Sequence, residues 1–445
     1  MTDKVKFSSY VHKHFKYTLD QLAKNKSKAD NIYHVNYTSV NCYLENFNQS
    51  VLDAICHNIA KKQYSCEPLT PIILPKINCL KHHAMTVDNT RLVCVPSVQD
   101  RILQRLFIKY LKNNYKKIYN KFCEYDHALN KDILSKRIDI IGKDDQSAKK
   151  TINGIRKALD DVIEYRNKYK YVIKADVVKF FDNIDREIAV KKFQKEFIGL
   201  SEDKELVAIF RSFVYCDAKL DYGDQKHLSL IEIYLNELKG KGVRQGMPIA
   251  SLCSSMYLHD FDNLMVKNDI PYIRYADDFL IFSDSYDRAK KLKAYAQQQL
   301  RAIGLDIEKS YGEQKTEIYG SKKGFSYLGF EVVYNPRLNE YQRYIPKPVF
   351  ERAIGRISSF DSITKVKREL GHRMDYLGFS TYLNSLVSGY TNFYSEELAI
   401  NGKRFNRELD KASKMARKKL ITDNLNIDFE KIGSNNQKMF FFGVK

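Results

Sequence analysis

The sequence predicts an α+β fold in which a strand-rich middle section follows one helical section and precedes another. Three observations support this prediction. Residues 1–60 have mostly helical character, strand-like and helical segments alternate between 171 and 330, and the chain becomes helical again after Pro346. A chain of 445 residues can bury a large core and form about two to four subdomains.

The first 120 residues change from helical to strand-like character and back. A polar stretch at 24–30 interrupts the helical residues 1–60. The segments 71–74 and 92–95 are short and rich in aliphatic residues, as is typical of strands. Between 101 and 120, apolar residues recur with the period of an amphipathic helix, at positions 102, 103, 106, 107, 110 and 111.

An aspartate pair lies at the turn of a predicted β-hairpin. The apolar segment 270–272 precedes Asp277 and Asp278, and the apolar run 279–282 follows them. Adjacent carboxylates repel one another, and leaving them unpaired in apolar surroundings is costly. A divalent cation removes that cost, and magnesium prefers one or two carboxylates together with substrate phosphates. The alternative is an acidic hairpin turn, where aspartate is common.

A second carboxylate favours the metal-site interpretation. Asp176 lies inside the β-rich run 171–185, where an unpaired charge is unfavourable unless another group neutralises it. Further along, the glycine-bearing loop 242–248 runs into an apolar helical stretch at 249–261.

Composition indicates a polyanionic partner. Lysine and arginine exceed aspartate and glutamate by 20 charges, and the sequence pI is about 9.3, which suits nucleic acid. A basic membrane-surface protein is the rival class. However, residues 1–17 are charged and lack an apolar signal core, and no window is long and apolar enough to span a bilayer, so we expect a cytoplasmic protein without a membrane partner. The eight cysteines are scattered without a Cys-x-x-Cys pair, which argues against a zinc ribbon or a disulfide framework.

The three segments around Asp176, Gly246 and Asp277 resemble, in this order, motifs A, B and C of reverse transcriptases. Residues 324–330 resemble the primer-grip segment, and 90–96 with 100–104 resemble the fingers motif of the group II intron and bacterial branch. The resemblance covers roughly residues 70 to 395. It implies a right-hand polymerase with an antiparallel palm sheet and a helical thumb. The implied parts are a helical N-terminal extension (1–60), fingers (61–170), palm (171–335), and thumb with C-terminal tail (336–445).

The resemblance implies RNA-directed DNA synthesis with two Mg²⁺ ions, for which Mn²⁺ is a possible substitute. Two ions about 4 Å apart activate the primer 3′-oxygen and neutralise the pyrophosphate, so carboxylates must converge from separate strands. Asp176 and Asp277 would bridge the ions, Asp278 would assist, and the carbonyl of Val177 would be a further ligand. We expect the neighbouring Asp182 and Asp185 to act as helix caps instead.

Further residues match the family's nucleotide-binding positions. Phe181, five residues after Asp176, corresponds to the aromatic gate that selects deoxynucleotides, whereas we expect Phe180 to pack in the core. Gln245 and Gly246 match the nucleotide-positioning pair, and the glycine allows close backbone approach. Arg91 matches the arginine that clamps the triphosphate. The companion lysine is absent because position 89 is Asn, and Lys76 is the candidate substitute.

The remaining candidate residues lie towards the C-terminus. Motif D normally supplies a lysine that protonates the pyrophosphate, and of Lys309 and Lys315 the second fits the family pattern better. Motif B departs from the pattern, since Ala250-Ser251 replaces the usual Ser-Pro. The implied primer and template contacts are Tyr327, Leu328 and Gly329 in the grip and Lys414, Arg417 and Lys418 in the basic helix-compatible stretch 403–419. The alternative for that stretch is a solvated helix face. The apolar residues 439–442 are expected to dock onto the body or another subunit.

Several types of reverse transcriptase are disfavoured by features of the sequence. The Gln245-Gly246 pair disfavours the diversity-generating type, retron signatures are absent, and no Cys-paired endonuclease follows the thumb. What remains resembles the unknown-group, defence-associated enzymes, which implies an associated non-coding RNA as template, DNA as product and deoxynucleoside triphosphates as substrates. The alternatives are a maturase that binds RNA as a splicing cofactor, and an untemplated or protein-primed polymerase.

Overall fold

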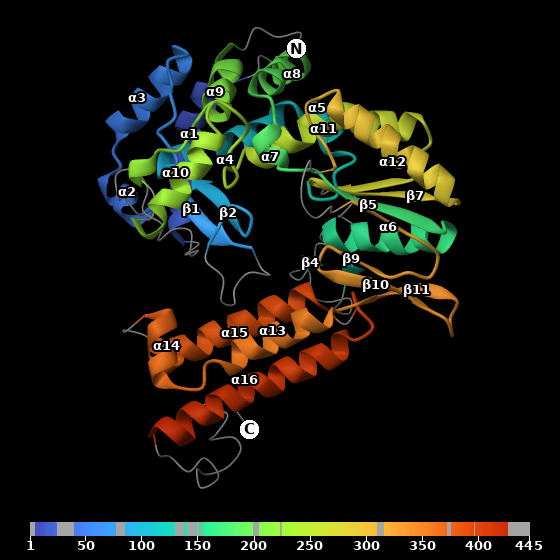
Figure 1. Cartoon of the computed structure of the whole chain (residues 1–445). Helices are drawn as coiled ribbons and strands as arrows, with labels where there is room; N and C mark the ends of the chain where they lie inside the picture. Colours follow the sequence, from blue (N-terminus) through green and yellow to red (C-terminus); the bar gives the residue numbers. More distant parts are fainter. Residues whose placement is uncertain are drawn as a thin grey trace. The chain divides into compact units, whose positions relative to one another are not determined.

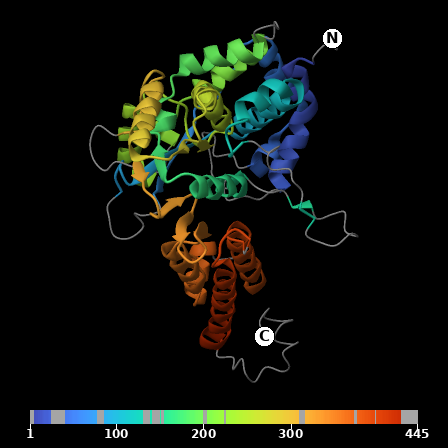
Figure 2. The ribbon, with the colours of Figure 1, turned by 90° about the vertical axis from the view of Figure 1, so that its right-hand side faces the viewer.

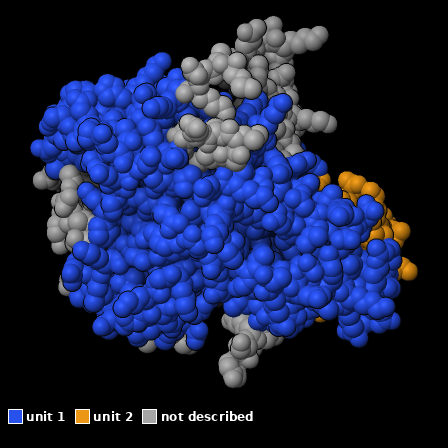
Figure 3. Space-filling view, turned by 90° about the horizontal axis from the view of Figure 1, so that it is seen from above, with its two compact units in different colours: residues 1–158, 173–318 blue, residues 159–172, 319–445 orange. Residues whose placement is uncertain are grey.

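The computed structural model describes residues 5–24, 40–76, 85–129, 138–139, 149–150, 154–198, 204–222, 225–308, 316–371, 375–395 and 397–425. The chain divides into two compact units, residues 1–158 with 173–318 and residues 159–172 with 319–445 (Figure 3). The dividing points fall inside α6 (Gly154–Lys168), β5 (Tyr171–Asp176) and β8 (Glu317–Tyr319). Residues 319–335, which the sequence assigns to the palm, belong to the second unit.

Helices make up most of the first unit (Figure 1). They are α1 (Phe7–Lys24), α2 (Val40–Asn46), α3 (Gln49–Ala60), α4 (Val98–Asn114), α5 (Lys116–Cys123), α7 (Phe180–Asn183), α8 (Arg186–Ile198), α9 (Lys204–Val214), α10 (Leu228–Glu237), α11 (Ala250–Lys267) and α12 (Tyr286–Arg301), with 3₁₀ turns at Leu220–Tyr222 and Gln225–His227. The apolar positions predicted from the helical period between 101 and 120 are all buried in α4. Phe107 of α4 packs its ring against Phe7, Phe193, Phe210 and Phe213, so four helices share one aromatic core.

The strands of the first unit form three sheets. β1 (Thr70–Pro75) and β2 (Thr90–Val95) are an antiparallel pair at the predicted positions, and β3 (Ile138–Asp139) pairs with β4 (Lys149–Lys150). The third sheet has the order β6-β7-β5-β8, with β6 (Tyr272–Tyr275) and β7 (Asp278–Ser283) joined as the predicted hairpin. Phe261 of α11 packs on the hairpin at Phe279, with ring centroids 5.5 Å apart. The buried side of the hairpin is therefore fixed by apolar packing.

The second unit combines a small antiparallel sheet with a helical bundle. The sheet has the order β11-β10-β9, formed by β9 (Phe325–Tyr327), β10 (Phe330–Asn335) and β11 (Glu340–Tyr344). The helices α13 (Lys347–Ser358), α14 (Ile363–Leu370), α15 (Tyr376–Phe393) and α16 (Gly402–Leu425) follow, with α13, α15 and α16 packed on one another (Figure 2). The sequence predicts helical structure after Pro346, and these helices confirm it. The apolar residues 439–442 lie outside the described residues.

A buried arginine ties the start of the second unit to its sheet. Arg166 is 2% exposed, and its guanidinium donates to the carbonyls of Tyr169, Lys170 and Gly320 and to the hydroxyl of Tyr341. The guanidinium also lies 4.3 Å from the centroid of the Tyr341 ring. The Tyr341 hydroxyl accepts a second bond from the Lys322 amide at 2.8 Å. The Tyr341 hydroxyl on β11 therefore bonds both to Arg166 of α6 and to Lys322, which lies just before β9.

Tyr341→Phe should lower the stability of the chain by about 1–3 kcal/mol, because two donors lose a buried acceptor while the ring remains in place. Thermal unfolding followed by circular dichroism is the measurement. Tyr344→Phe is the matched control, since within the described part of the chain that hydroxyl bonds to Gln342 on its own strand, at 3.2 Å. Equal unfolding midpoints for the two variants would contradict the assigned role of Tyr341.

Candidate active site

The predicted carboxylates lie at the ends of neighbouring strands. Asp176 is the last residue of β5, Asp278 is the first residue of β7, and β5 lies beside β7 in the antiparallel sheet (Figure 1). In antiparallel neighbours, the end of one strand and the start of the next meet at the same edge. Asp277 occupies the turn directly before β7, and all three carboxylates are half-buried. The structure thus brings the three predicted residues to one edge of the sheet.

The donor set fits a magnesium-type cation. Among the described residues, no cluster of three or more His, Cys, Asp or Glu side chains is arranged as a metal site by itself. Magnesium does not require such a cluster, because it is commonly held by one or two carboxylates and completes its shell with water and substrate phosphates. Half-buried carboxylates on two adjacent strand ends match that requirement, and they leave the remaining positions for substrate oxygens.

The turn that carries Asp277 has an unusual backbone. Tyr275 pairs with Asp278, so Ala276 and Asp277 form a two-residue turn, and Ala276 has a φ of +57°. Both main-chain groups of Ala276 are held by buried side chains. Its amide donates to Asp126 Oδ1 at 3.0 Å, and its carbonyl accepts from Arg274 Nη1 at 2.9 Å.

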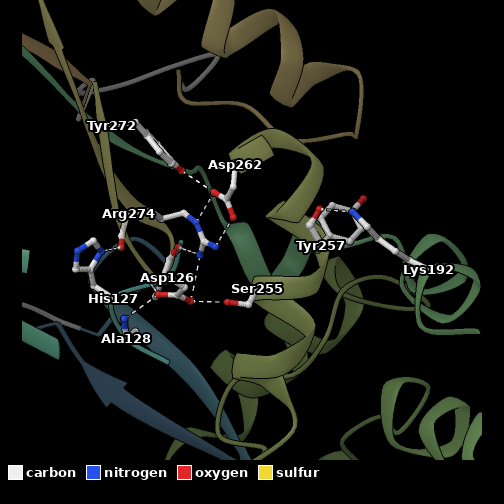
Figure 4. A network of polar contacts seen from close by, with 10 residues as sticks. Asp126, His127, Ala128, Lys192, Ser255, Tyr257, Asp262, Tyr272 and Arg274 are labelled. Atoms are coloured by element: carbon white, nitrogen blue, oxygen red, sulfur yellow. Dashed lines mark hydrogen bonds and ion pairs between the residues drawn. The ribbon is translucent and has the colours of Figure 1, made fainter. Parts of the chain in front are cut away.

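Arg274 is the centre of a buried polar network (Figure 4). The side chain is fully buried, with its guanidinium between the carboxylates of Asp262 and Asp126. Nε and Nη2 donate to Asp262 at 2.8 and 2.6 Å, and Nη1 lies 3.1 Å from Asp126 Oδ2. Burial alone would lower the pKa of Arg274, but Asp262 and Asp126 outweigh it and raise that pKa well above its usual value. Burial likewise acts to raise the pKa of Asp126, but Arg274 and the hydrogen bonds to the carboxylate lower it overall.

The segment after β5 places two aromatic side chains differently. Lys179 adopts a φ of +45°, and the short helix α7 begins at Phe180. Phe180 is 2% exposed and belongs to the core, as predicted, whereas Phe181 is half-buried and contacts the Phe180 ring edge-on at 5.2 Å. Asp185 caps α8 as expected, since its carboxylate accepts the Ile188 amide at 2.8 Å.

The motif B loop is bonded to motif A and to β2 through main-chain atoms. The Val243 amide donates to the carbonyl of Phe181, and the Cys94 amide of β2 donates to the carbonyl of Gln245, both at 2.8 Å. Gly242 and Gly246 have positive φ values, and a Cβ on either residue would lie within 2.7 Å of main-chain atoms of the facing segment. Phe181, Gln245 and Gly246 are therefore close together because the backbones themselves are in contact.

Two buried arginines, Arg186 and Arg244, form hydrogen bonds at and before the start of this loop. Asp217 accepts from Arg186 at 2.5 Å and from Arg244 at 2.7 Å. Arg186 also donates to the carbonyl of Gly242 at 2.7 Å, and Arg244 donates to the carbonyl of Leu238 at 2.7 Å. Asp217 thus pairs with two cations, one of which bonds the first residue of the loop, Gly242, and the other the carbonyl of Leu238 before it.

The remaining fingers residues lie on the β1–β2 hairpin. Arg91 is exposed on β2 and pairs with Leu74 of β1. Lys76 follows β1, and its Nζ donates to the carbonyl of Asp88 at 2.5 Å. Asn89, where the family has a lysine, accepts the Thr86 amide through its side chain at 2.8 Å. Position 89 therefore stabilises the turn in this chain.

The other predicted residues lie either outside the described part of the chain or in the second unit. Lys315 and Lys309 lie outside the described residues. In the second unit, Tyr327 is buried at the end of β9, and Leu328 and Gly329 form the two-residue turn to β10 with φ values of +48° and +85°. Lys414 and Lys418 of α16 are exposed, whereas Arg417 is 5% exposed and donates to Asn384 of α15. Helical geometry places Arg417 on the face that packs on α15.

Sequence reasoning missed the network around Arg274. An arginine inside an apolar strand next to the aspartate pair was a usable signal, because a buried cation requires anionic partners. The partners Asp126 and Asp262 lie on other elements, so local patterns do not identify them.

None of the described helices is long and apolar enough to cross a membrane.

One comparison with known proteins identifies the family of this chain. The family model "Reverse transcriptase (RNA-dependent DNA polymerase)" matches residues 75–332, more than half of the chain. No curated protein matches the chain. Among solved structures, telomerase from Candida albicans in complex with a TWJ fragment of telomeric RNA is similar with 12% identity and a TM-score of 0.38, covering 90% of this chain and 69% of that chain. The fold is the α+β right-hand polymerase class that the motifs predict, and the protein is an enzyme. The chain belongs to the reverse transcriptase family.

Proposed function

We propose that this reverse transcriptase copies RNA into DNA at the sheet edge where Asp176, Asp277 and Asp278 lie. The observation that carries the proposal is the position of the three half-buried carboxylates at two neighbouring strand ends, Asp176 at the end of β5 and Asp277 with Asp278 at the start of β7. Nucleotidyl transfer needs such convergence, since negative charge must be balanced at both the attacking and the leaving oxygen.

Asp176 and Asp277 would hold two Mg²⁺ ions, with Asp278 beside them and the carbonyl of Val177 as a further ligand. When bound, the ions supply the Lewis acidity that activates the primer hydroxyl and neutralises the pyrophosphate. The protein's own contribution is geometric. The strand ends and the turn at Ala276 fix the carboxylates before substrate arrives, so little reorganisation is needed during the reaction.

The loop formed by Gln245 and Gly246, together with Phe181, would hold the incoming deoxynucleotide. The main-chain bonds that join this loop to Phe181 and Cys94 support the assignment, because they hold the three segments next to one another. Gly246 is exposed and lacks a side chain, so a ligand can approach its backbone closely. Arg91 and Lys76 at the hairpin of the fingers would bind the triphosphate, and Lys315 would donate the proton to the departing pyrophosphate.

The second unit would bind the primer and template. The tight turn at Leu328 and Gly329, after the buried Tyr327, presents main-chain groups suited to a primer terminus. Lys414 and Lys418 are exposed on α16, where they would contact phosphates and release counterions. Arg417 would act indirectly, by packing α16 on α15 through Asn384.

Asp277→Ala and Asp176→Ala should each lower deoxynucleotide incorporation about 10³-fold or more, because metal stabilisation of several kcal/mol is lost and each 1.36 kcal/mol is a factor of ten. Incorporation with magnesium on a primed RNA template is the measurement. Asp284→Ala, an exposed carboxylate just after β7, is the control and should stay near wild type. Near-normal activity in either test variant would refute the metal assignment.

Phe181→Ala should raise the ratio of ribonucleotide to deoxynucleotide incorporation about tenfold or more, since loss of about 1.4 kcal/mol of steric discrimination has that effect. The control is Phe180→Leu, which should lower the thermal midpoint and leave the ratio unchanged because Phe180 is in the core. A ratio that rises in the control and not in the test variant would transfer the gate to Phe180.

At the level of biology, we propose that the template is a dedicated non-coding RNA and that the chain serves bacterial antiviral defence. The support is the formal charge of +20 and the sequence departures that disfavour the diversity-generating, retron and complete intron types. A basic polymerase with a cognate RNA gains its specificity from RNA shape and single-stranded loops.

If this assignment holds, the tagged protein purified from its native host should carry one abundant structured RNA encoded at its own locus, together with cDNA copied from it. Bound RNA and DNA are sequenced before and after phage challenge, with Asp277→Ala as the control that retains RNA but lacks cDNA. Homopolymeric DNA would favour an untemplated polymerase. Intron RNA without cDNA would favour a maturase.

A further inference from the structure

The carboxylate of Asp126 joins four groups that come from three parts of the first unit. Oδ1 accepts the amides of Ala276 at 3.0 Å and of Ala128 at 2.9 Å. Oδ2 accepts the Ser255 hydroxyl of α11 at 2.6 Å and lies 3.1 Å from Arg274 Nη1. Asp126 is 1% exposed, so each of these bonds is shielded from water. A side chain that follows α5 is thus bonded directly to the turn that carries Asp277.

The second carboxylate of the network, Asp262, has different hydrogen-bond partners. Asp262 of α11 binds the Arg274 guanidinium and accepts the Tyr272 hydroxyl at 2.9 Å. Among the described residues, the hydrogen bonds of Asp262 lead to side chains and not to the main chain. Asp126 and Asp262 therefore both neutralise Arg274, but the bond to the main chain of the turn belongs to Asp126.

The turn requires such a bond. Ala276 has a Cβ, and a φ of +57° brings a Cβ close to the neighbouring carbonyl, a conformation that L-residues other than glycine rarely adopt. The Asp126 bond to the amide and the Arg274 bond to the carbonyl hold Ala276 in that conformation. Because Ala276 directly precedes Asp277, its dihedral angles set the direction of the two following carboxylates.

We propose that Asp126 is a positioning residue for DNA synthesis, which holds Ala276 in the left-handed conformation so that Asp277 and Asp278 face Asp176. This inference rests on the catalytic role proposed above for Asp277 and Asp278. Asp126 acts through the turn and does not itself touch substrate. A part of the chain that follows α5 thereby controls the geometry of the carboxylates.

Asp126→Asn and Asp262→Asn form a matched pair of isosteric variants, since each leaves Arg274 with one carboxylate. In Asp126→Asn the amide oxygen is drawn to the Arg274 cation, so the NH₂ group faces the Ala276 amide and the bond to the turn is lost. We expect both variants to lower the thermal midpoint. Asp126→Asn should also lower kcat at least tenfold and raise the magnesium concentration for half-maximal activity at least threefold, with KM for deoxynucleotide within twofold. Asp262→Asn should keep kcat within threefold.

Ala276→Gly provides a rescue that a merely structural role would not give. Glycine adopts a positive φ without steric cost, so Asp126→Asn with Ala276→Gly should recover at least threefold in kcat over Asp126→Asn. The same change should bring no recovery in the Asp262→Asn background. Equal kcat losses in the two Asn variants, or absence of rescue, would overturn the proposal.

Two further variants keep the test decisive. If Asp126→Asn fails to fold, Ala276→Val tests the turn directly, because a β-branched residue disfavours the left-handed region, and a kcat within twofold of wild type would overturn the proposal. Asp277→Ala is measured alongside. If it retains activity, the proposed catalytic site itself is wrong. If it is inactive while Asp126→Asn behaves as wild type, the positioning role alone is wrong.

Discussion

The fully buried cation of Arg274 is the constraint on which the turn before Asp277 and the segments packed around it depend. A guanidinium without water must be neutralised, and removal of one partner from a buried ion pair typically costs about 3–5 kcal/mol. This chain meets the requirement with two carboxylates, one after α5 and one on α11, and the same guanidinium bonds the turn before Asp277. The folding of three separate segments is thus linked to the geometry of one turn.

A second group of charges, in which two buried arginines share one aspartate, bonds the main chain at the motif B loop. Asp217 pairs with Arg186 and Arg244, and these cations bond the carbonyl of Gly242 at the start of the loop and that of Leu238 before it. Apart from Arg244, which lies in the motif B loop, these charged residues are not among those that the family motifs identify. In both cases the arginines that bond the main chain are buried, whereas Asp176, Asp277, Asp278 and Gln245 are half-buried.

Local patterns in the sequence were sufficient for several helices and strands, including the hairpin that carries Asp277 and Asp278. The helical period in α4, the hairpin around Asp277 and the core position of Phe180 depend on neighbouring residues, and the structure has them as predicted. The partners of Arg274 could not be found in this way, because Asp126 and Asp262 reach it only through the fold. Arg417 illustrates a different limit. Charge and spacing group it with Lys414 and Lys418, but the helix turns its side chain towards Asn384.

The main-chain bonds between the loop of Gln245 and its neighbours have an evolutionary consequence. Cys94, Val243 and Phe181 take part through amide and carbonyl groups that every residue except proline possesses, so their side chains can drift without loss of these contacts. Gly242 and Gly246 differ, because any side chain would collide with the facing backbone. Across a diverging lineage, these two positions should remain glycine even where the surrounding identities have been replaced.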